Sequence, residues 1–507
     1  DVRCIYKDTN GNIWIGTSKG LALFNANTET FTNFHNNPGN IHGALSSYIF
    51  SIKQLKDNKL WIATELNGIM ILDLQQNQFL LPEQIRFEFI REGDNNYSLS
   101  NASARYIFQD SFNNIWIGTW GGGINFISNA PPTFHTWSYS PTQMNESSLS
   151  NKVVSSVCDD GQGKLWIGTD GGGINVFENG KRVAIYNKEN RELLSNSVLC
   201  SLKDSEGNLW FGTYLGNISY YNTRLKKFQI IELEKNELLD VRVFYEDKNK
   251  KIWIGTHAGV FVIDLASKKV IHHYDTSNSQ LLENFVRSIA QDSEGRFWIG
   301  TFGGGVGIYT PDMQLVRKFN QYEGFCSNTI NQIYRSSKGQ MWLATGEGLV
   351  CFPSARNFDY QVFQRKEGLP NTHIRAISED KNGNIWASTN TGISCYITSK
   401  KCFYTYDHSN NIPQGSFISG CVTKDHNGLI YFGSINGLCF FNPDIAINSP
   451  QIPPVVITKV RIPGRLTSRE KNETAIPISE GEIELTHEQN SFNLTFNVQD
   501  YSLANQV

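Results

Sequence analysis

Long apolar segments and a strong excess of charge are both missing from this sequence. No run within the 507 residues is long enough to span a bilayer, and the chain begins at Asp1 without a signal peptide. The net charge of −3 argues against a nucleic-acid-binding surface. We therefore expect a soluble piece of a longer protein that binds no nucleic acid.

Patterns that would build a disulfide framework or a metal site are missing too. The nine cysteines are odd in number, and most lie inside apolar segments such as GLVCF and GLCFF, as small buried side chains do. The segments DTNGN and DKNGN are too tightly spaced for a calcium loop and lack its later glutamate. The sequence predicts neither a metal nor a cofactor.

One phrase, in contrast, is abundant. DSEGNLWFGT at 204–213 returns as DSEGRFWIGT at 292–301 and as DTNGNIWIGT at 8–17. Its aromatic residue recurs about every 44 residues, which is the repeat length of four-stranded propeller blades. The ten positions are Trp14, Trp61, Trp116, Trp166, Trp210, Trp253, Trp298, Trp342, Trp386 and Tyr431.

The repeat around Trp298 shows how one blade is built. VRSIAQD predicts a first strand, DSEG a turn, RFWIGT a second strand, GVGIY a third and LVRKFNQY a fourth. Four short strands without a helical stretch form an antiparallel meander, so the predicted fold class is all-β. The tryptophan of the second strand is expected to pack between blades.

Strand counting predicts the domain organisation. The last repeat lacks a fourth strand before NPDIAINSPQIPP, whereas TFHTWSY at 133–139 reads as a fourth strand without its first three. Because a propeller must close or expose a sheet edge, we expect 133–139 to complete the blade of Tyr431. Residues 131–446 would then form a closed seven-bladed propeller, and 1–130 the last three blades of a second propeller whose start is missing. A single ten-bladed ring is the alternative.

The repeat stops near the segment PQIPPV. VVITKVRI and IELTHEQNSFNLTFNVQDYS, with their polar spacers, read as strands of a small Ig-like β-sandwich. Residues 447–507 are therefore expected to be the start of such a sandwich, truncated before its end.

Convergent catalytic groups are absent from the repeats. The ten histidines are scattered, no two share a ligand spacing on one strand, and no nucleophile phrase G-x-S-x-G occurs. This favours a binding module over an enzyme. A propeller-type polysaccharide lyase or another propeller lyase is the alternative, and a protein-interaction scaffold is a third interpretation.

The repeats and the tail together resemble a known family. DxxGxxWIGTxxG repeats followed by NSFNLTFNVQDYS are similar to the periplasmic sensor region of bacterial hybrid two-component systems of the Bacteroidetes type. These carry two-component-regulator propeller repeats and a domain named for three tyrosines (Y_Y_Y), of which Tyr501 matches one. The resemblance implies a non-catalytic periplasmic sensor, followed by a transmembrane helix and a histidine kinase. It further implies oligosaccharide ligands, control of polysaccharide-utilisation genes, and a homodimer joined near Phe492 to Tyr501.

Candidate ligand residues lie at one face of the ring, which we call the mouth. It is formed by the turns between second and third strands together with the loops that lead into the first strands. The turn residues are Asp170, Tyr214, His257, Phe302, Glu347, Asn390 and Asn436, and the loop residues are Asn151, Asn196, Asp240, Asn284, Asn328 and His373. Amides, acids and aromatics suit hydroxyl-rich ligands, although each asparagine also suits a plain turn.

A recurring arginine helps to select the candidate ligand-binding residues. Just inside the first strand, five of the ten repeats carry Arg3, Arg105, Arg242, Arg287 and Arg375. An arginine there either stacks and pairs within its own repeat or presents a guanidinium to the carboxylate or sulfate of an acidic sugar. We select Arg242, Arg287 and His373 as ligand-binding residues of the closed ring.

Two tryptophans, Trp120 and Trp137, lie outside the repeat position. Trp120 belongs to the turn TWGGG, whose glycines let another surface approach the backbone closely. An exposed tryptophan is a platform on which a sugar ring stacks, and it can also be buried between propellers. We select Trp120 together with Arg105 as a second candidate ligand site.

Overall fold

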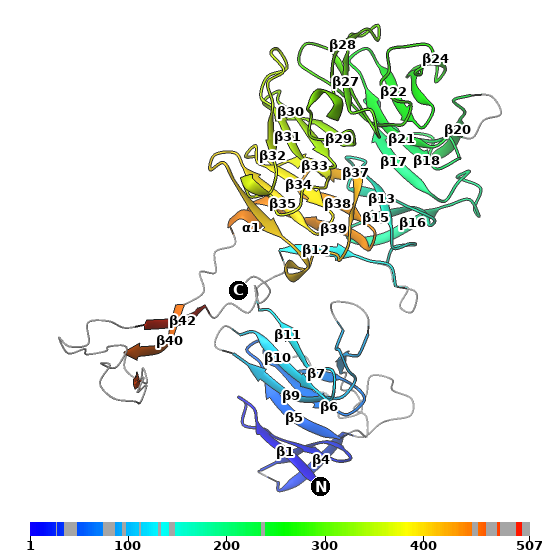
Figure 1. Cartoon of the computed structure of the whole chain (residues 1–507). Helices are drawn as coiled ribbons and strands as arrows, with labels where there is room; N and C mark the ends of the chain where they lie inside the picture. Colours follow the sequence, from blue (N-terminus) through cyan, green and yellow to red (C-terminus); the bar gives the residue numbers. More distant parts are fainter. Residues whose placement is uncertain are drawn as a thin grey trace. The chain divides into compact units, whose positions relative to one another are not determined.

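The computed structural model confirms the all-β fold class (Figure 1). It describes residues 1–26, 28–34, 48–74, 87–93, 98–110, 113–129, 133–140, 148–234, 239–448, 455–462, 474–476 and 493–498. The chain divides into two compact units, Asp1–Pro132 and Thr133–Val507. The predicted boundary near residue 131 lies outside the described residues and stays a prediction.

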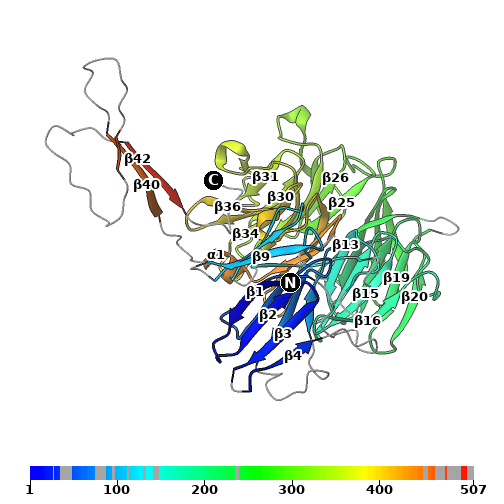
Figure 2. The ribbon, with the colours of Figure 1, turned by 90° about the horizontal axis from the view of Figure 1, so that it is seen from below.

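The first unit contains three antiparallel sheets among its described residues. Its strands are β1 (Val2–Lys7), β2 (Ile13–Thr17), β3 (Gly20–Asn25), β4 (Thr30–Phe34), β5 (Ile49–Gln54), β6 (Lys59–Thr64), β7 (Ile69–Asp73), β8 (Glu88–Ile90), β9 (Ala104–Gln109), β10 (Ile115–Thr119) and β11 (Ile124–Ile127). Strands β1 to β4 lie side by side in one sheet (Figure 2), β5 to β8 form the second, and β9 to β11 form a three-stranded third. The first strands β1, β5 and β9 contact one another in that order, as they do in successive propeller blades.

The second unit contains seven four-stranded sheets within the described part of the chain. The first half of its strands are β12 (Phe134–Trp137), β13 (Val154–Asp159), β14 (Lys164–Thr169), β15 (Gly173–Glu178), β16 (Lys181–Tyr186), β17 (Val198–Lys203), β18 (Leu209–Thr213), β19 (Ile218–Asn222), β20 (Lys227–Ile231), β21 (Val241–Glu246), β22 (Lys251–Thr256), β23 (Gly259–Asp264) and β24 (Val270–Tyr274). The second half are β25 (Val286–Gln291), β26 (Phe297–Thr301), β27 (Val306–Tyr309), β28 (Leu315–Phe319), β29 (Ile330–Arg335), β30 (Met341–Thr345), β31 (Gly348–Phe352), β32 (Gln361–Phe363), β33 (Ile374–Glu379), β34 (Ile385–Thr389), β35 (Ile393–Ile397), β36 (Cys402–Tyr406), β37 (Phe417–Lys424), β38 (Ile430–Ser434) and β39 (Gly437–Phe441). Short 3-10 turns follow at Gln321–Glu323, Arg365–Glu367 and His408–Asn410.

These sheets follow one another around a ring. The first strands β13, β17, β21, β25, β29, β33 and β37 each contact the next, and β37 in turn contacts β13. The fourth strand of the last sheet is β12, so that its order is β12-β39-β38-β37. Phe134 pairs with Phe441 and Trp137 with Leu438, which confirms the predicted strand exchange.

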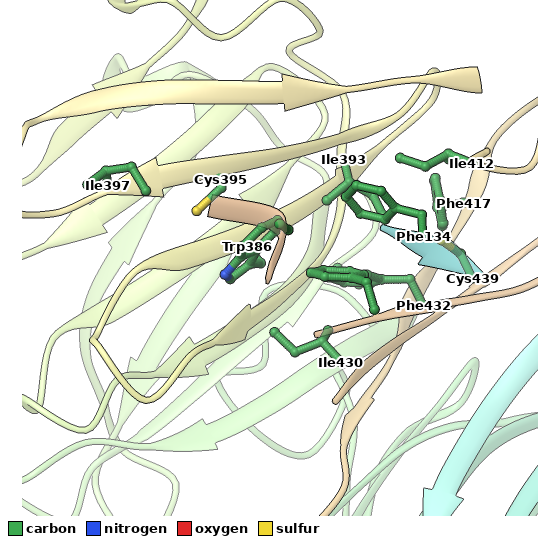
Figure 3. Packing of buried hydrophobic residues seen from close by; sticks show 13 residues of the cluster. Phe134, Trp386, Ile393, Cys395, Ile397, Ile412, Phe417, Ile430, Phe432 and Cys439 are labelled. Carbon is green, nitrogen blue, oxygen red and sulfur yellow. The ribbon is translucent and has the colours of Figure 1, made fainter. Parts of the chain in front are cut away.

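The exchanged strand is anchored by its aromatic side chains. Phe134 is fully buried and lies among Trp386 and Ile393 of the neighbouring sheet and Phe432 of its own sheet (Figure 3). Trp137 stacks on Phe177 of the first complete blade, with 4.5 Å between ring centroids. Trp137 therefore packs between two blades, which explains the presence of a tryptophan outside the repeated aromatic position.

The aspartate of the DxxG phrase holds each blade together. In the Asp204 repeat, one carboxylate oxygen accepts the backbone N–H groups of Glu206 (3.0 Å) and Asn208 (2.8 Å), and the other accepts the indole N–H of Trp210 (2.9 Å). The same aspartate-to-aromatic bond recurs in eight repeats among the described residues, with Tyr431 donating to Asp425 in the last. The DxxG carboxylate thus shapes a turn and fixes the tryptophan, as expected for a structural phrase.

Two further features complete the described chain. The helix α1 (Pro443–Asn448) follows β39, where the sequence predicted only the absence of a strand. Beyond it, β40 (Val455–Ile462), β41 (Thr474–Ile476) and β42 (Asn493–Val498) form a three-stranded sheet in the order β41-β40-β42. Phe492 and Tyr501 lie outside the described residues, so the predicted sandwich stays a prediction.

The cysteines behave as small side chains. Five of the nine are buried and all nine are free thiols. Burial raises the pKa of the Cys158 and Cys351 thiols to about 12. Among the described residues, no helix has the length and hydropathy that crossing a membrane requires.

Candidate functional site

Each first strand carries a β-bulge at the position where arginine recurs. The register of the first and second strands shifts at this single residue in nine repeats, and between Phe417 and Val422 in the tenth. A bulged residue is not paired in the ladder, and bulges re-aim side chains next to binding sites. In ring order, the bulged residues of the second unit are Ser155, Leu199, Arg242, Arg287, Asn331, Arg375 and the segment 418–421.

The mouth of the ring is built as the sequence predicted. The turn between second and third strands bonds to the loop that leads into the first strand of the same blade. The amide of Phe302 donates to the carbonyl of Phe285 at 2.9 Å, and the amide of Gly346 donates to that of Thr329 at 3.1 Å. Turn residues and loop residues therefore share one side of the ring.

A cavity of about 400 Å³ opens at this mouth. Arginine, histidine, glutamate and an aromatic ring share its wall with amide and hydroxyl groups. The lining residues are Arg287, Phe302, Gln321, Ser327, Asn328, Thr329, Gly346, Glu347, His373 and Arg375. The predicted residues Arg287 and His373 thus come together in one site, with Arg375 as a neighbour.

Buried polar groups hold the two arginines in place. The side-chain oxygen of Asn331 accepts Nη1 of Arg287 at 2.8 Å and Oγ of Ser419 at 3.2 Å, while its amide donates to the carbonyl of Ile374 at 2.6 Å. Arg375 donates from Nη1 to Ser419 at 3.2 Å. Asn331 is almost fully buried, so this relay across four adjacent blades fixes the guanidinium groups before any ligand arrives.

The cluster carries uncompensated positive charge. Within the described part of the chain, neither Arg287 nor Arg375 has a carboxylate at ion-pair distance. Burial, and then the charges of Arg242 and Arg375, lower the pKa of Arg287 to about 10. Burial and the charge of Arg375 also lower the pKa of His373, against the opposing effect of Glu347, so His373 is neutral at pH 7.

Arg242 differs from its two neighbours because it has an acidic partner. Its Nη2 lies 2.6 Å from Oδ2 of Asp240, and the other carboxylate oxygen of Asp240, Oδ1, contacts Nδ1 of His257. Its guanidinium lies 5.3 Å from the ring centroid of Phe285, which Arg287 faces from 5.5 Å. Arg242 therefore does not line the cavity, but its positive charge helps to lower the pKa of Arg287.

The second candidate pair lies in the first unit. The guanidinium of Arg105 is placed between two aromatic rings, 3.9 Å from the centroid of Phe50 and 4.6 Å from that of Trp120. Its Nη2 lies 3.9 Å from Glu65, and Trp120 is 68% exposed. The structure thus brings Trp120 and Arg105 together as an exposed cation–aromatic stack.

Sequence reasoning missed the residues that position the arginines. Asn331 and Ser419 occupy the same bulge as Arg287 and Arg375 in neighbouring blades. Asparagine and serine are common in strands and loops, so these two polar residues do not stand out from the sequence as the arginines do. Comparing all ten repeats at the bulge is the signal that would have found them. Among the described residues, no group of three histidine, cysteine or acidic side chains could hold a metal ion.

Comparison with known proteins agrees with this fold. The family described as two component regulator propeller matches residues 1–19, 98–121, 148–171, 192–215, 280–303 and 368–391. The chain therefore carries two-component regulator propeller repeats, as its sequence predicted. No curated protein sequence matches the chain significantly.

Solved structures give more detail. The chain is 94% identical, over its whole length, to the extracellular domain of the hybrid two component system BT3049 from B. thetaiotaomicron, with a TM-score of 0.78. It spans 65% of the length of that domain. The extracellular domain of a second such system, BT4673 of the same organism, is 18% identical with a TM-score of 0.55, and the chain covers 72% of it. This second likeness concerns the fold alone.

Proposed function

We propose that this chain is the ligand-sensing part of a hybrid two-component system and that it binds an oligosaccharide at the mouth of its second unit. The observation that carries this proposal is the cavity lined by Arg287, Phe302 and His373. Its size is that of a small-molecule site, and a few fixed polar groups converge in it. Phe302 is 47% exposed, so its ring is free to stack on a sugar face while the amides and hydroxyls bind sugar hydroxyls.

The similarity to an extracellular domain supports the rest of the assignment. We place the chain in the periplasm, ahead of a membrane anchor and a kinase that lie in other parts of the protein. Ligand binding would be passed to that kinase and would control polysaccharide-utilisation genes. Binding energy can shift a two-state equilibrium only through different affinities for the two states, so the ligand must bind the signalling state more tightly.

Calorimetry with a panel of plant and host oligosaccharides tests the binding step. One ligand should bind with a stoichiometry near one per chain, and Phe302→Ala should weaken it. Tyr322→Ala is the matched control, because Tyr322 is an almost fully exposed aromatic residue that does not line the cavity. Equal affinity of both variants for the ligand would refute the proposed site.

A lyase is the second candidate, because a neutral histidine and two arginines share the cavity. In such a reaction His373 would take the proton next to the carboxylate of a uronic acid, and the glycosidic C–O bond would break as a double bond forms. Incubation with the same panel, followed by the ultraviolet absorbance of the unsaturated product, decides between the two. Product release that His373→Ala abolishes would establish the lyase.

The third part of the proposal concerns assembly. We propose that the full-length protein is a homodimer whose tail, near Phe492 to Tyr501, forms or transmits the contact. The support for this is the resemblance of the tail to a domain that precedes the membrane helix in such sensors. Cross-links in the full-length protein should map to the tail, and cross-links that map only to the propeller would contradict the proposal.

A further inference from the structure

The cavity at the mouth contains more positive charge than its own residues neutralise. Arg287 and Arg375 both line it, and the one acidic residue in the wall, Glu347, forms an ion pair with neither of them among the described residues. Glu347 is near enough to act on the titration of His373, yet it leaves both guanidinium groups without a bonded counter-charge. A partly buried cation pair of this kind is stabilised by an added anion.

The geometry also leaves donors free for that anion. A guanidinium has five N–H donors. Within the described residues, Arg287 uses only Nη1, toward Asn331, and Arg375 uses Nε toward Asn390 and Nη1 toward Ser419. Arg287 therefore keeps Nε and one terminal nitrogen, and Arg375 keeps Nη2. Because Asn331 and Ser419 fix both groups, an anion finds its donors in place and little side-chain ordering is required on binding.

The rest of the cavity points to a sugar that carries the anion. The guanidinium of Arg287 lies 4.4 Å from the ring centroid of Phe302, whose side chain is partly exposed. Gln321, Ser327 and Asn328 add polar groups suited to hydroxyls. A bare inorganic anion needs neither an aromatic platform nor this volume.

We infer that the cavity recognises an acidic saccharide unit, a sugar bearing a carboxylate or a sulfate, with Arg287 and Arg375 binding the anionic group and Phe302 stacking on the ring. This inference rests on the proposed function and narrows it from oligosaccharides in general to one chemical class. It also assigns separate roles to the residues of the cavity, which an experiment can separate.

The test is calorimetry on the full chain with four probes. They are an oligogalacturonide, its methyl ester, a sulfated disaccharide and inorganic sulfate. Carboxylate and sulfate probes distinguish the two sources of the anion, the ester keeps the sugar but removes the charge, and inorganic sulfate keeps the charge but removes the sugar. At least one acidic saccharide should bind, more weakly at high salt, and the ester and the inorganic ion should bind at least about tenfold more weakly.

Matched variants show which residues are responsible. Arg287→Gln and Arg375→Gln should each weaken the acidic probe by about 10- to 100-fold, because each loses a charge-assisted hydrogen bond. Arg287→Lys keeps the charge but loses the planar set of N–H donors of the guanidinium, so its affinity for the acidic probe should lie between those of the parent and Arg287→Gln. Arg356→Gln is the control, since Arg356 is highly exposed and lies outside the cavity. Circular dichroism and the melting temperature show that each variant is folded.

The outcomes separate this inference from the proposed function. An ester that binds as tightly as the acid, with full affinity in Arg287→Gln, would overturn the acidic-sugar inference and leave an oligosaccharide sensor. Inorganic sulfate that binds as tightly as the saccharides would overturn the role of the sugar. Failure of every acidic and neutral saccharide in the panel to bind would overturn both.

Discussion

In the two repeats that lack the DxxG aspartate, the indole N–H of the tryptophan has no hydrogen-bond acceptor within the described part of the chain, and in one of them a single substitution should supply it. Leu55 and Ser336 stand where the other repeats have aspartate, and the indole N–H groups of Trp61 and Trp342 are buried without a partner among the described residues. A buried donor without a partner costs about 1–3 kcal/mol. Ser336→Asp should place a carboxylate oxygen against Trp342, as Asp204 does against Trp210.

The surroundings of Ser336 already tolerate this carboxylate. In the Asp204 repeat, the next residue, Ser205, donates its amide to Glu246 at 2.7 Å. In the Ser336 repeat, Ser337 likewise donates its amide to Glu379 at 2.7 Å. A second acidic group is thus already placed beside the turn in both repeats. The gain of a charged hydrogen bond, less the cost of burying the carboxylate, leaves a net stabilisation of about 1 kcal/mol.

The reciprocal substitution is the matched control. Asp204→Ser should turn a complete repeat into the arrangement of the Ser336 repeat and destabilise the protein by about 2–4 kcal/mol, because the indole and a turn amide lose their acceptor. Chemical denaturation of both variants measures the two changes, and Ser336→Asp should raise the melting temperature by about 1–3 °C. A folded Ser336→Asp variant that is less stable than the parent would refute the reasoning.

Three further predictions follow from the packing and the charges. Phe134→Asp should destabilise the second unit by more than about 3 kcal/mol, because it buries a charge where β12 pairs with β39 to complete the last sheet. An unchanged melting temperature would contradict this pairing. Affinity for an acidic saccharide should rise as the pH falls from about 8 to 5.5, because the bound anion raises the pKa of His373, which burial and the charges of Arg375 and Arg287 lower in the free protein. Titration calorimetry at several pH values measures this, and affinity that falls over the interval would contradict it. Trp120→Ala should weaken glycan binding with little change in melting temperature if the Trp120–Arg105 stack is a second ligand site, and full glycan affinity in this variant would show that it is not.

The periodic part of the fold could be predicted from the sequence because the same pattern of strands and turns recurs in every repeat. The spacing of the tryptophans predicts the blades, and the orphan segment 133–139 predicts the exchanged strand that β12 forms with β39. The short helix α1 was not predicted because the repeat pattern indicates only that no fourth strand follows β39. The packing of Trp137 on Phe177 was missed because it joins the exchanged strand β12 of the last sheet to β15 of the adjacent sheet, and the strand count does not give contacts between sheets.

The candidate site was predicted in part because its residues are of two kinds. Arg287 and His373 differ from a plain turn or strand residue, so their chemistry marks them in the sequence. Asn331 and Ser419 are ordinary polar residues whose importance comes from a relay between four blades. Such a relay depends on side-chain directions at the bulges, and a repeat spacing alone does not contain them.

The bulge explains how one repeat can serve both stability and recognition. In the eight repeats that have both, the aspartate and the aromatic residue are bonded to each other, and the threonine is bonded within its own blade as well, as Thr213 is to the carbonyl of Asn217. Any change at these positions costs stability, so they are tied to the fold. The bulged residue has no partner in the ladder, and Arg242, Asn331 and Leu199 all occupy it without altering the strand pairing. A change of side chain at a bulge therefore alters the charge of the mouth while the blades remain intact.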